Sequence, residues 1–134
     1  MQYMLLICGN EAAAAKMTPA VGQQVMGAYF AYTEAMRKAG VYKDGNPLQQ
    51  TSTASTVRMK NGKSIVLDGP YAESKEQIGG YYVIDVANLD EALSWAAKCP
   101  AVAHGGGVEV RPIMAAAASL PQINNIYCMK LSYD

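Results

Sequence analysis

Two carboxylates, one histidine and one arginine are the side chains in this sequence best suited to acid/base chemistry on a small molecule. Asp68 ends a β-rich run, Glu73 follows it closely, and His104 is the only histidine of the chain. A carboxylate at a strand end can act as a general base or orient one, and an imidazole can carry a proton near neutral pH. Arg111, two residues after Glu109, has the planar guanidinium that binds a substrate carboxylate.

Each of these residues also has a structural interpretation, and the sequence leaves the choice open. Residues 68–70, Asp-Gly-Pro, are a turn signal, because aspartate bonds nearby amides and proline keeps the preceding residue out of the helical region. His104 lies among alanine and glycine and can be incidental. Glu109 and Arg111 share one strand face, so they either pair with each other or line a wet cavity.

The segment after this turn predicts local structure more than chemistry. Ser74 and Gln77 fit a capping box for a single helical turn, which places the neighbouring charges in solvent. Glu73 precedes that cap, so it is the better functional candidate. The Gly79-Gly80 pair lets the backbone re-enter a sheet and leaves room for a ligand or a partner chain. It lacks the glycine spacing of a dinucleotide-binding loop.

The overall composition excludes several other classes of function. Eleven basic residues balance eleven acidic ones, and no basic run is interleaved with aromatic residues. We therefore expect no nucleic acid and no anionic membrane among the partners. One histidine with scattered carboxylates gives no recognisable metal-ligand set, and no Gly-x-Ser-x-Gly elbow occurs. We expect neither a metal nor a cofactor.

The cysteines and the first residues predict a location in the cytoplasm. Cys8, Cys99 and Cys128 are odd in number and widely separated, as expected for reduced thiols. The apolar run at residues 4–8 is too short for a signal peptide and follows no basic residue. No segment approaches the length of a membrane span, so we expect a soluble protein.

The elements that must position these residues begin with a strand and a long helix. Residues 2–8 form a short apolar run, ended by a Gly-Asn pair, that predicts a buried strand. Thr18-Pro19 is a helix start, and Gly40 is a stop. Between them, Tyr29 and Tyr32 lie on one apolar stripe, either as core aromatics or with hydroxyls in a pocket. The pocket alternative makes Tyr29 a candidate for substrate binding.

The middle of the chain predicts a loop, a hairpin and a further strand. Residues 41–53 contain a dense Asp-Gly-Asn-Pro turn signal, and we expect a loop there that could border a site. Residues 54–60 and 64–67 are β-rich and are joined through Asn61-Gly62, the pair best able to adopt the positive φ angles of a tight hairpin turn. Residues 80–86 are rich in tyrosine, valine and isoleucine and predict another strand.

The last third of the chain predicts a second helix and a final strand. Asn88 starts the helix, Glu91 is placed to complete a capping box, and Pro100 lies just past the end. Residues 108–111 alternate with period two and predict the last strand. The alanine-rich C-terminal tail has one strand-like run, at residues 126–131, which would frame a partner surface or add an edge strand.

The order of elements is strand, helix, two or three strands, helix and strand, all within one domain. Two helices on one face of an antiparallel sheet give an α+β, ferredoxin-like two-layer sandwich. The other sheet face then needs a cover, and a chain of this size often pairs with a copy of itself. We expect a homodimer, sheet against sheet, with a cavity for a small-molecule ligand in the enclosed space.

Residues 68–82, DGPYAESKEQIGGYY, resemble the signature of the DGPF subgroup of the YCII-related domain family. Three other stretches agree with the family, at residues 2–7, 90–100 and 107–112. The resemblance covers most of residues 1–113, which we take as the domain, and leaves residues 114–134 as a C-terminal extension. It implies a dimeric α+β barrel of ferredoxin-like subunits.

The resemblance implies less about function. Members of the subgroup are often encoded beside extracytoplasmic-function sigma factors, which makes such a factor a candidate partner. The wider family is thought to contain enzymes with a His/Asp pair in a cleft, the histidine being on the first helix. That helix here has Tyr29, Phe30 and Tyr32 and no histidine, so the pair does not transfer. Tyr71 stands where phenylalanine is usual, and its added hydroxyl makes it a candidate for substrate binding.

Three functional hypotheses follow. The first is an acid/base enzyme of lyase or isomerase type, with Asp68 as base or orienting group and Arg111 as anion clamp. Glu73 and His104 are its supporting acid/base groups. The second is a non-catalytic ligand sensor or accessory protein that uses the same pocket and works with a sigma factor. The third is a purely structural dimer, which leaves the charges on the strand faces unexplained.

Overall fold

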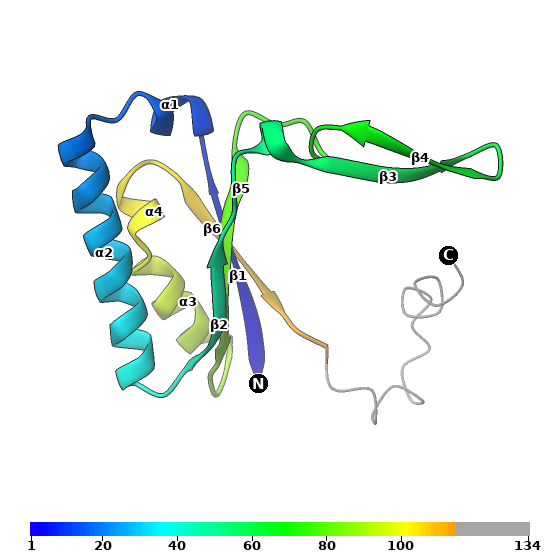
Figure 1. Ribbon diagram of the computed structural model, residues 1–134. Helices are drawn as coiled ribbons and strands as arrows, with labels where there is room; N and C mark the ends of the chain where they lie inside the picture. The colour runs from blue at the N-terminus through cyan, green and yellow to red at the C-terminus, as the bar shows by residue number, and fades with distance from the viewer. Residues whose placement is uncertain (115–134) are drawn as a thin grey trace.

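The computed structural model describes residues 1–114 of the 134-residue chain and shows an α+β sandwich (Figure 1). Four antiparallel strands form its main sheet in the order β2-β5-β1-β6. Their bounds are β1 Gln2–Gly9, β2 Tyr42–Pro47, β5 Gln77–Asp85 and β6 Gly107–Pro112. The helices α2 (Pro19–Lys38) and α3 (Leu89–Ala97) cover one face of this sheet. The predicted ferredoxin-like α+β fold is confirmed.

Shorter elements connect these strands and helices. The helix α1 (Glu11–Ala15) follows β1, the 3-10 turn η1 (Thr51–Thr53) follows β2, and α4 (Pro100–Ala103) precedes β6. The strands β3 (Ser55–Lys60) and β4 (Lys63–Asp68) form a two-stranded sheet of their own. This hairpin, which we call the arm (residues 55–68), projects from the main sheet on the side away from the helices (Figure 1).

The turn of the arm confirms the predicted hairpin. Asn61 and Gly62 have positive φ angles of 52° and 77°, as a tight hairpin turn requires. The register pairs Val57 with Val66 and Lys60 with Lys63. Neither strand of the arm pairs with a strand of the main sheet. The arm therefore adds no strand to the main sheet.

Side-chain caps fix the starts of α2 and α3, as predicted. The Thr18 hydroxyl accepts a hydrogen bond from the Val21 N–H (3.3 Å) at the start of α2. The Asn88 side chain accepts from the Glu91 N–H (3.0 Å) at the start of α3, and the Glu91 carboxylate accepts from the Ala87 N–H (2.8 Å). These bonds satisfy backbone donors that have no partner inside the helix.

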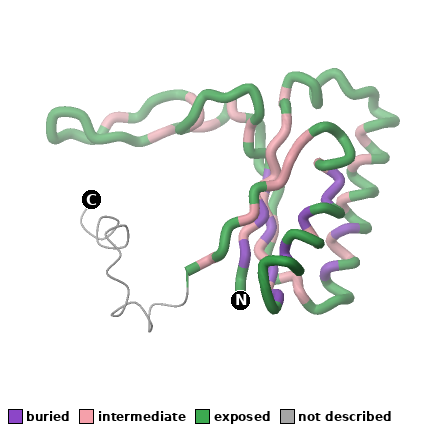
Figure 2. The backbone as a smooth tube through the Cα atoms, turned by 180° about the vertical axis from the view of Figure 1, so that it is seen from behind, coloured by how far each residue is buried: buried purple, intermediate pink, exposed green. Residues whose placement is uncertain are grey.

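The hydrophobic core lies between the main sheet and the helices. Its buried side chains come from alternate positions of β1 and β5 and from the inward faces of α2 and α3 (Figure 2). Leu5, Met36 and Ile84 are fully buried. Tyr32 is a core aromatic whose hydroxyl donates to the Trp95 carbonyl oxygen (2.7 Å), so the core alternative holds for this tyrosine.

The predicted loop over residues 41–53 is wrong in its first half, which forms strand β2. Its turn-rich composition is tolerated because β2 is an edge strand that pairs with β5 alone, and its register shifts near Asp44. Pro47 closes the strand at the edge, where a missing N–H is tolerated. Gly45 lets the Tyr82 ring pack directly on the strand, since a Cβ there would lie 2.6 Å from the ring.

The predicted helical turn at Ser74 is also wrong. Residues 69–76 run from the arm to β5 without a helix. The Ser74 hydroxyl donates to the Glu76 carbonyl oxygen, and the Gln77 side-chain amide donates to the Ser74 carbonyl oxygen (2.7 Å). The Gln77 side-chain oxygen accepts from the Glu11 N–H (3.1 Å). The polar side chains that suggested a cap therefore stabilise a bend between strands.

Some expectations fall on residues that the structure does not describe. The tail, its strand-like run at residues 126–131 and Cys128 lie outside residues 1–114. Within the described range, Cys8 is half-buried, Cys99 is buried, and both are free thiols. No helix in this range is long and apolar enough to cross a membrane.

Gly80 and Gly79 give a matched test of the close packing at the start of β5. A Cβ at Gly80 would lie 2.9 Å from the Asn46 carbonyl oxygen, whereas a Cβ at Gly79 would meet nothing within 4 Å. We expect Gly80→Ala to lower the free energy of unfolding by about 1–3 kcal/mol, the usual cost of overpacking. Gly79→Ala should change it by less than about 0.5 kcal/mol. Urea unfolding measures both values, and equal effects would contradict the contact.

Candidate functional site

A cavity of about 680 Å³ lies between α2, α1 and the adjoining end of the main sheet. Its walls also include strands β1, β2 and β5 and the loop between α4 and β6. Ligand pockets commonly measure roughly 300–1,000 Å³ and combine an apolar wall with a few polar groups. This cavity therefore has the size of a site for a small organic molecule.

Glycines keep the sheet end of the cavity free of side chains. Gly45 in β2, Gly80 in β5 and Gly106 before β6 all line it. At each of them a neighbouring backbone atom or aromatic ring lies too close to allow a Cβ. Tyr82 and Ile84 lie on the same face of β5 as Gly80, and their side chains fill the core. The empty space begins where the inward side chains of the sheet give way to glycine.

One ridge of α2 forms the wall opposite the sheet. Val25, Tyr29, Thr33 and Arg37 recur every four residues, and all four line the cavity. Residues four apart lie on the same side of a helix. Thr33 and Arg37 are polar, so they fall outside the apolar stripe that predicts the core. The four-residue recurrence from Tyr29 is the sequence signal that could have found them.

Thr33 and Tyr82 join the helix to the sheet through a directional chain of hydroxyl groups. The Thr33 hydroxyl donates to the Tyr29 backbone carbonyl oxygen (2.9 Å) and lies 2.9 Å from the Tyr82 hydroxyl. A hydroxyl has one proton to donate, so Thr33 must accept from Tyr82. The Tyr82 oxygen then has a free lone pair and no proton to offer. Any group that binds it from the cavity must be a hydrogen-bond donor.

The tyrosine hydroxyls of the site stay protonated at neutral pH. Burial raises the pKa of Tyr29 well above its ordinary value, and the nearby Cys99 side chain raises it further. Burial is also the main cause of the raised pKa of Tyr82. A phenol that loses its hydration on burial holds its proton more tightly. These two side chains therefore act as neutral hydrogen-bonding groups.

Arg37 brings a positive charge to the cavity wall. Its guanidinium lies over the Tyr42 ring, 4.8 Å from the centroid, and 3.8 Å from the Glu34 carboxylate. The pair with Glu34 is an exposed contact of little energetic weight. The planar guanidinium has donors along its edge, so Arg37 can bind an anionic ligand while it stays stacked on Tyr42.

Glu11 lies in the cavity wall with both carboxylate oxygens occupied. One oxygen accepts from the Thr51 N–H (2.9 Å) and the other from the Thr51 hydroxyl (2.7 Å). The Glu11 N–H donates to the Gln77 side chain (3.1 Å). Glu11 thus ties α1 to η1 and to the start of β5, and it braces the cavity instead of supplying a free base.

Two of the residues predicted from the sequence, His104 and Tyr29, line this cavity. His104 directly follows α4 and is exposed, so its imidazole can meet both solvent and a ligand. Tyr29 lies in the middle of α2, in the first third of the sequence. The structure brings these two residues to one place although 75 positions separate them in the numbering.

Three other predicted residues lie outside the cavity in the single chain. Asp68 ends β4 opposite Ser55, and Glu73 is exposed in the connection that follows. Tyr71 is 76% exposed, with the Arg58 guanidinium 4.6 Å from its ring centroid. The structure therefore does not bring Asp68, Glu73 or Tyr71 to the cavity. Their catalytic and binding roles stay predictions.

Arg111 and Glu109 pair with each other in the single chain. Arg111 Nε lies 2.6 Å from Glu109 Oε2, and both side chains are exposed. Val108 and Val110 pack toward the core, so the pair lies on the other face of β6. Arg111 is outside the cavity, and its role as an anion clamp stays a prediction.

Cys8 also lines the cavity, but its thiol is not activated. Burial raises the pKa of Cys8, and the charges of Glu109 and Glu76 raise it further. The thiolate is the nucleophilic form, so a protonated Cys8 is a poor nucleophile at neutral pH. Among residues 1–114, no three His, Cys, Asp or Glu side chains gather closely enough to hold a metal ion.

Comparison with known proteins shows the family. The model of the YCII-related domain matches residues 1–117. The chain belongs to the YCII-related domain family. An uncharacterised protein of Rhizobium meliloti (strain 1021) is 37% identical over 114 residues, which are 84% of this YCII-related chain and 92% of that protein. The predicted family is confirmed, and the DGPF subgroup stays a prediction.

A solved structure shares the fold of this YCII-related chain. It is 5-chloro-2-hydroxyhydroquinone dehydrochlorinase (TftG) from Burkholderia phenoliruptrix AC1100, in complex with 2,5-dihydroxybenzoquinone. The TM-score is 0.50 at 15% sequence identity, over 88% of this chain and 98% of that one. At this identity the similarity concerns the fold, and it agrees with the α+β class.

The buried tyrosines predict how the stability of this YCII-related chain depends on pH. A tyrosine whose pKa rises on folding contributes stability that is full below its unfolded pKa of about 10 and is lost as the pH rises toward the folded pKa. We expect the free energy of unfolding to fall above about pH 10, and to fall less steeply in Tyr29→Phe. Urea unfolding at a series of pH values measures this, and parallel profiles would contradict the raised pKa of Tyr29.

Proposed function

We propose that this chain is a small-molecule acid/base enzyme of lyase or isomerase type, and that it binds its substrate in the cavity between α2 and the sheet. The observation that carries the proposal is the meeting of His104, Tyr29 and the hydroxyl chain of Thr33 and Tyr82 around one cavity. Imidazole is the side chain that most often transfers protons near neutral pH, so His104 is the proton carrier.

The ligand that fits these walls is a flat ring with hydroxyl groups. Tyr29, Tyr42 and Tyr82 line the cavity, and aromatic rings pack favourably edge to face or offset on one another. The Tyr82 oxygen can only accept, so the ligand presents a donor there. Arg37 is a partner for negative charge, which a deprotonated hydroxyl or a carboxylate would supply.

The structural neighbour supplies a chemical parallel and a probe. That protein is a dehydrochlorinase of a chlorinated hydroxyhydroquinone and was solved with 2,5-dihydroxybenzoquinone. Dehydrochlorination is a lyase reaction in which a proton and a chloride ion leave the substrate. The neighbour's ligand is a flat ring with two hydroxyl donors, and both features match the demands of the cavity.

The alternative is a protein that binds such a ligand without turning it over. The observation that favours it is the engagement of Glu11 by Thr51, which leaves no free carboxylate beside His104 among the described residues of the cavity wall. A sigma factor is the partner that this alternative would use. Asp68 and Glu73 would supply carboxylates only in an assembly that brings them to the cavity.

A homodimer in the cytoplasm is part of the proposal. The sheet face away from the helices has no described element over it, which supports pairing with a second copy (Figure 1). The two described cysteines are free thiols, as in a reducing compartment.

Titration calorimetry with 2,5-dihydroxybenzoquinone tests the site. We expect Tyr82→Phe to weaken binding by about tenfold, the effect of one lost hydrogen bond. Tyr71→Phe is the matched control, because Tyr71 is exposed and outside the cavity, and it should leave the dissociation constant unchanged. A loss of affinity in Tyr71→Phe but not in Tyr82→Phe would move the site to residues 68–82 and contradict the proposal.

Turnover separates the enzyme from the binding protein. With chloride release from 5-chloro-2-hydroxyhydroquinone as the readout, we expect His104→Gln to lower kcat by about 100-fold or more, the usual contribution of a general acid or base. Binding of 2,5-dihydroxybenzoquinone should stay nearly the same in this variant. Tight binding by the unmodified protein with no chloride release would favour the alternative for this substrate.

A further inference from the structure

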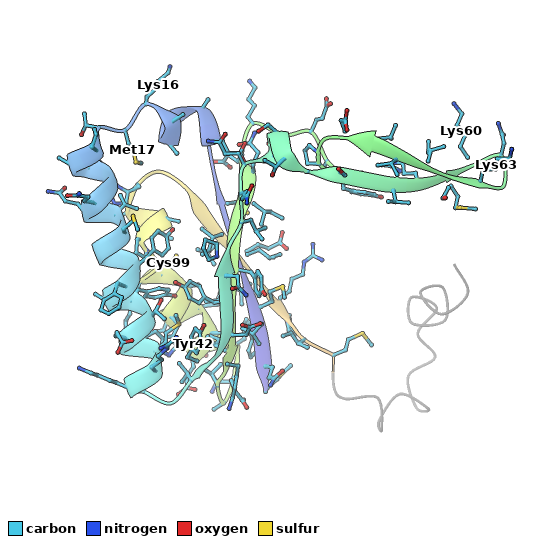
Figure 3. All side chains as sticks on the ribbon, in the orientation of Figure 1. Lys16, Met17, Tyr42, Lys60, Lys63 and Cys99 are labelled. Atoms are coloured by element: carbon cyan, nitrogen blue, oxygen red, sulfur yellow. The ribbon has the colours of Figure 1, made fainter. Side chains whose placement is uncertain are left out.

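The cavity runs along most of α2 and is longer than one aromatic ring. Val25 and Arg37 both line it, and they lie more than three helical turns apart. A rise of 1.5 Å per residue places them about 18 Å apart along the helix axis. Figure 3 shows Met17 beside the start of α2 and Tyr42 beside its end, and both residues line the cavity. A ligand made of a single ring therefore leaves much of the cavity empty.

The end of the cavity near Tyr42 is polar. The Arg37 guanidinium lies 4.8 Å from the centroid of the Tyr42 ring. The Thr33 and Tyr82 hydroxyl groups meet nearby, 2.9 Å apart. All four residues line the cavity. These are the groups that would bind the charge and the hydroxyl groups of the ring, so the ring belongs to this end.

The opposite end, which we call the α1 end, is apolar. Ala13 and Ala14 of α1, Met17 after it and Val25 of α2 line it. Met17 is 38% exposed and Val25 is half-buried, so both have surface left for a ligand. No residue of α1 is buried, and an alanine side chain is too short to fill the space that it faces. The α1 end therefore offers methyl groups around an unfilled space.

The polar side chains around the α1 end already have partners within the chain. The Asn10 side-chain oxygen caps α1 (3.0 Å), and both carboxylate oxygens of Glu11 bind Thr51. The Gln77 side chain accepts from the Glu11 N–H (3.1 Å) and donates to a backbone carbonyl oxygen (2.7 Å). A polar ligand group would have to displace one of these bonds to replace its lost hydration. An apolar ligand group has no such cost.

We propose that the substrate has an apolar chain on its hydroxylated ring, and that this chain binds at the α1 end. The inference rests on the proposed function, because that function assigns the ring to the polar end. The substrate class is then the alkyl-substituted hydroxyquinones and hydroxyhydroquinones. The chain contacts Ala13, Ala14, Met17 and Val25 and leaves water, which is favourable in proportion to the apolar surface that is buried. The flexible thioether of Met17 adapts to chains of different shape.

Titration calorimetry with a pair of probes tests the proposal. The probes are 2,5-dihydroxybenzoquinone and the same compound with a butyl group on the ring. Full burial of one methylene group tightens binding by about fourfold. We expect the butyl compound to bind the unmodified protein at least about tenfold more tightly than the unsubstituted ring. Ring binding with no gain from the butyl group would overturn this inference and leave the proposed function in place. Binding of neither probe would overturn both.

Two alanines of α1 give a matched pair of variants that locates the chain. Ala14 lines the cavity, whereas Ala12 does not, and both are exposed. Leucine is a good helix former, so neither substitution should unfold α1, and circular dichroism checks this. Ala14→Leu fills the space for the chain, and we expect it to reduce the gain from the butyl group at least about fivefold. Ala12→Leu should keep the full gain. Equal gains in both variants would place the chain elsewhere and overturn the inference.

A hydroxyl group at the far end of the butyl chain tests the apolar character of the α1 end. This probe has nearly the same length but must lose the hydration of its terminal hydroxyl to bind. We expect it to bind the unmodified protein at least about tenfold more weakly than the butyl compound, since the polar side chains there are already engaged. Equal affinities for the two probes would mean that the chain stays in water, and that result would overturn the inference.

Discussion

The packing of the Tyr82 ring against Gly45 is the contact on which the rest of the structure depends. A Cβ at Gly45 would lie 2.6 Å from that ring, so β2 pairs closely with β5 only because this residue is glycine. The ring meets Tyr32 edge to face with centroids 5.5 Å apart, and Tyr42 at 6.3 Å. Its hydroxyl bonds to Thr33 on α2. One side chain thus ties the edge strand, the sheet and the long helix together.

The same side chain marks the boundary between the core and the cavity. On one side of Tyr82, large side chains fill the space between sheet and helices; on the other side, β5 continues as Gly79-Gly80 and the space is open. The segment of residues 68–82 therefore has two structural roles. Its last residues shape the cavity, and its first residues fix the base of the arm. Neither task uses the carboxylates that make the motif conspicuous.

Local preferences made much of the fold predictable, and non-local contacts account for what was missed. The caps at Thr18 and Asn88 and the hairpin turn depend on neighbouring residues alone, and the structure has each of them. The edge strand β2 depends on a distant tyrosine ring, so its sequence looks like a loop. Residue type was enough to single out His104, which the structure places in the cavity wall, and its chemical role stays a prediction. Asp68 and Glu73 lie outside the cavity, at the base of the arm. Local sequence does not predict the direction in which the arm leaves the sheet, so it could not predict where these two residues lie.

A crystal structure of the full chain with 2,5-dihydroxybenzoquinone would show directly where the ligand binds. We predict a flat ring bound between α2 and the sheet, with a hydroxyl group donating to Tyr82 and with His104 at the rim of the cavity. A ring bound beside Asp68 and Glu73 at the base of the arm, with the cavity empty, would contradict it.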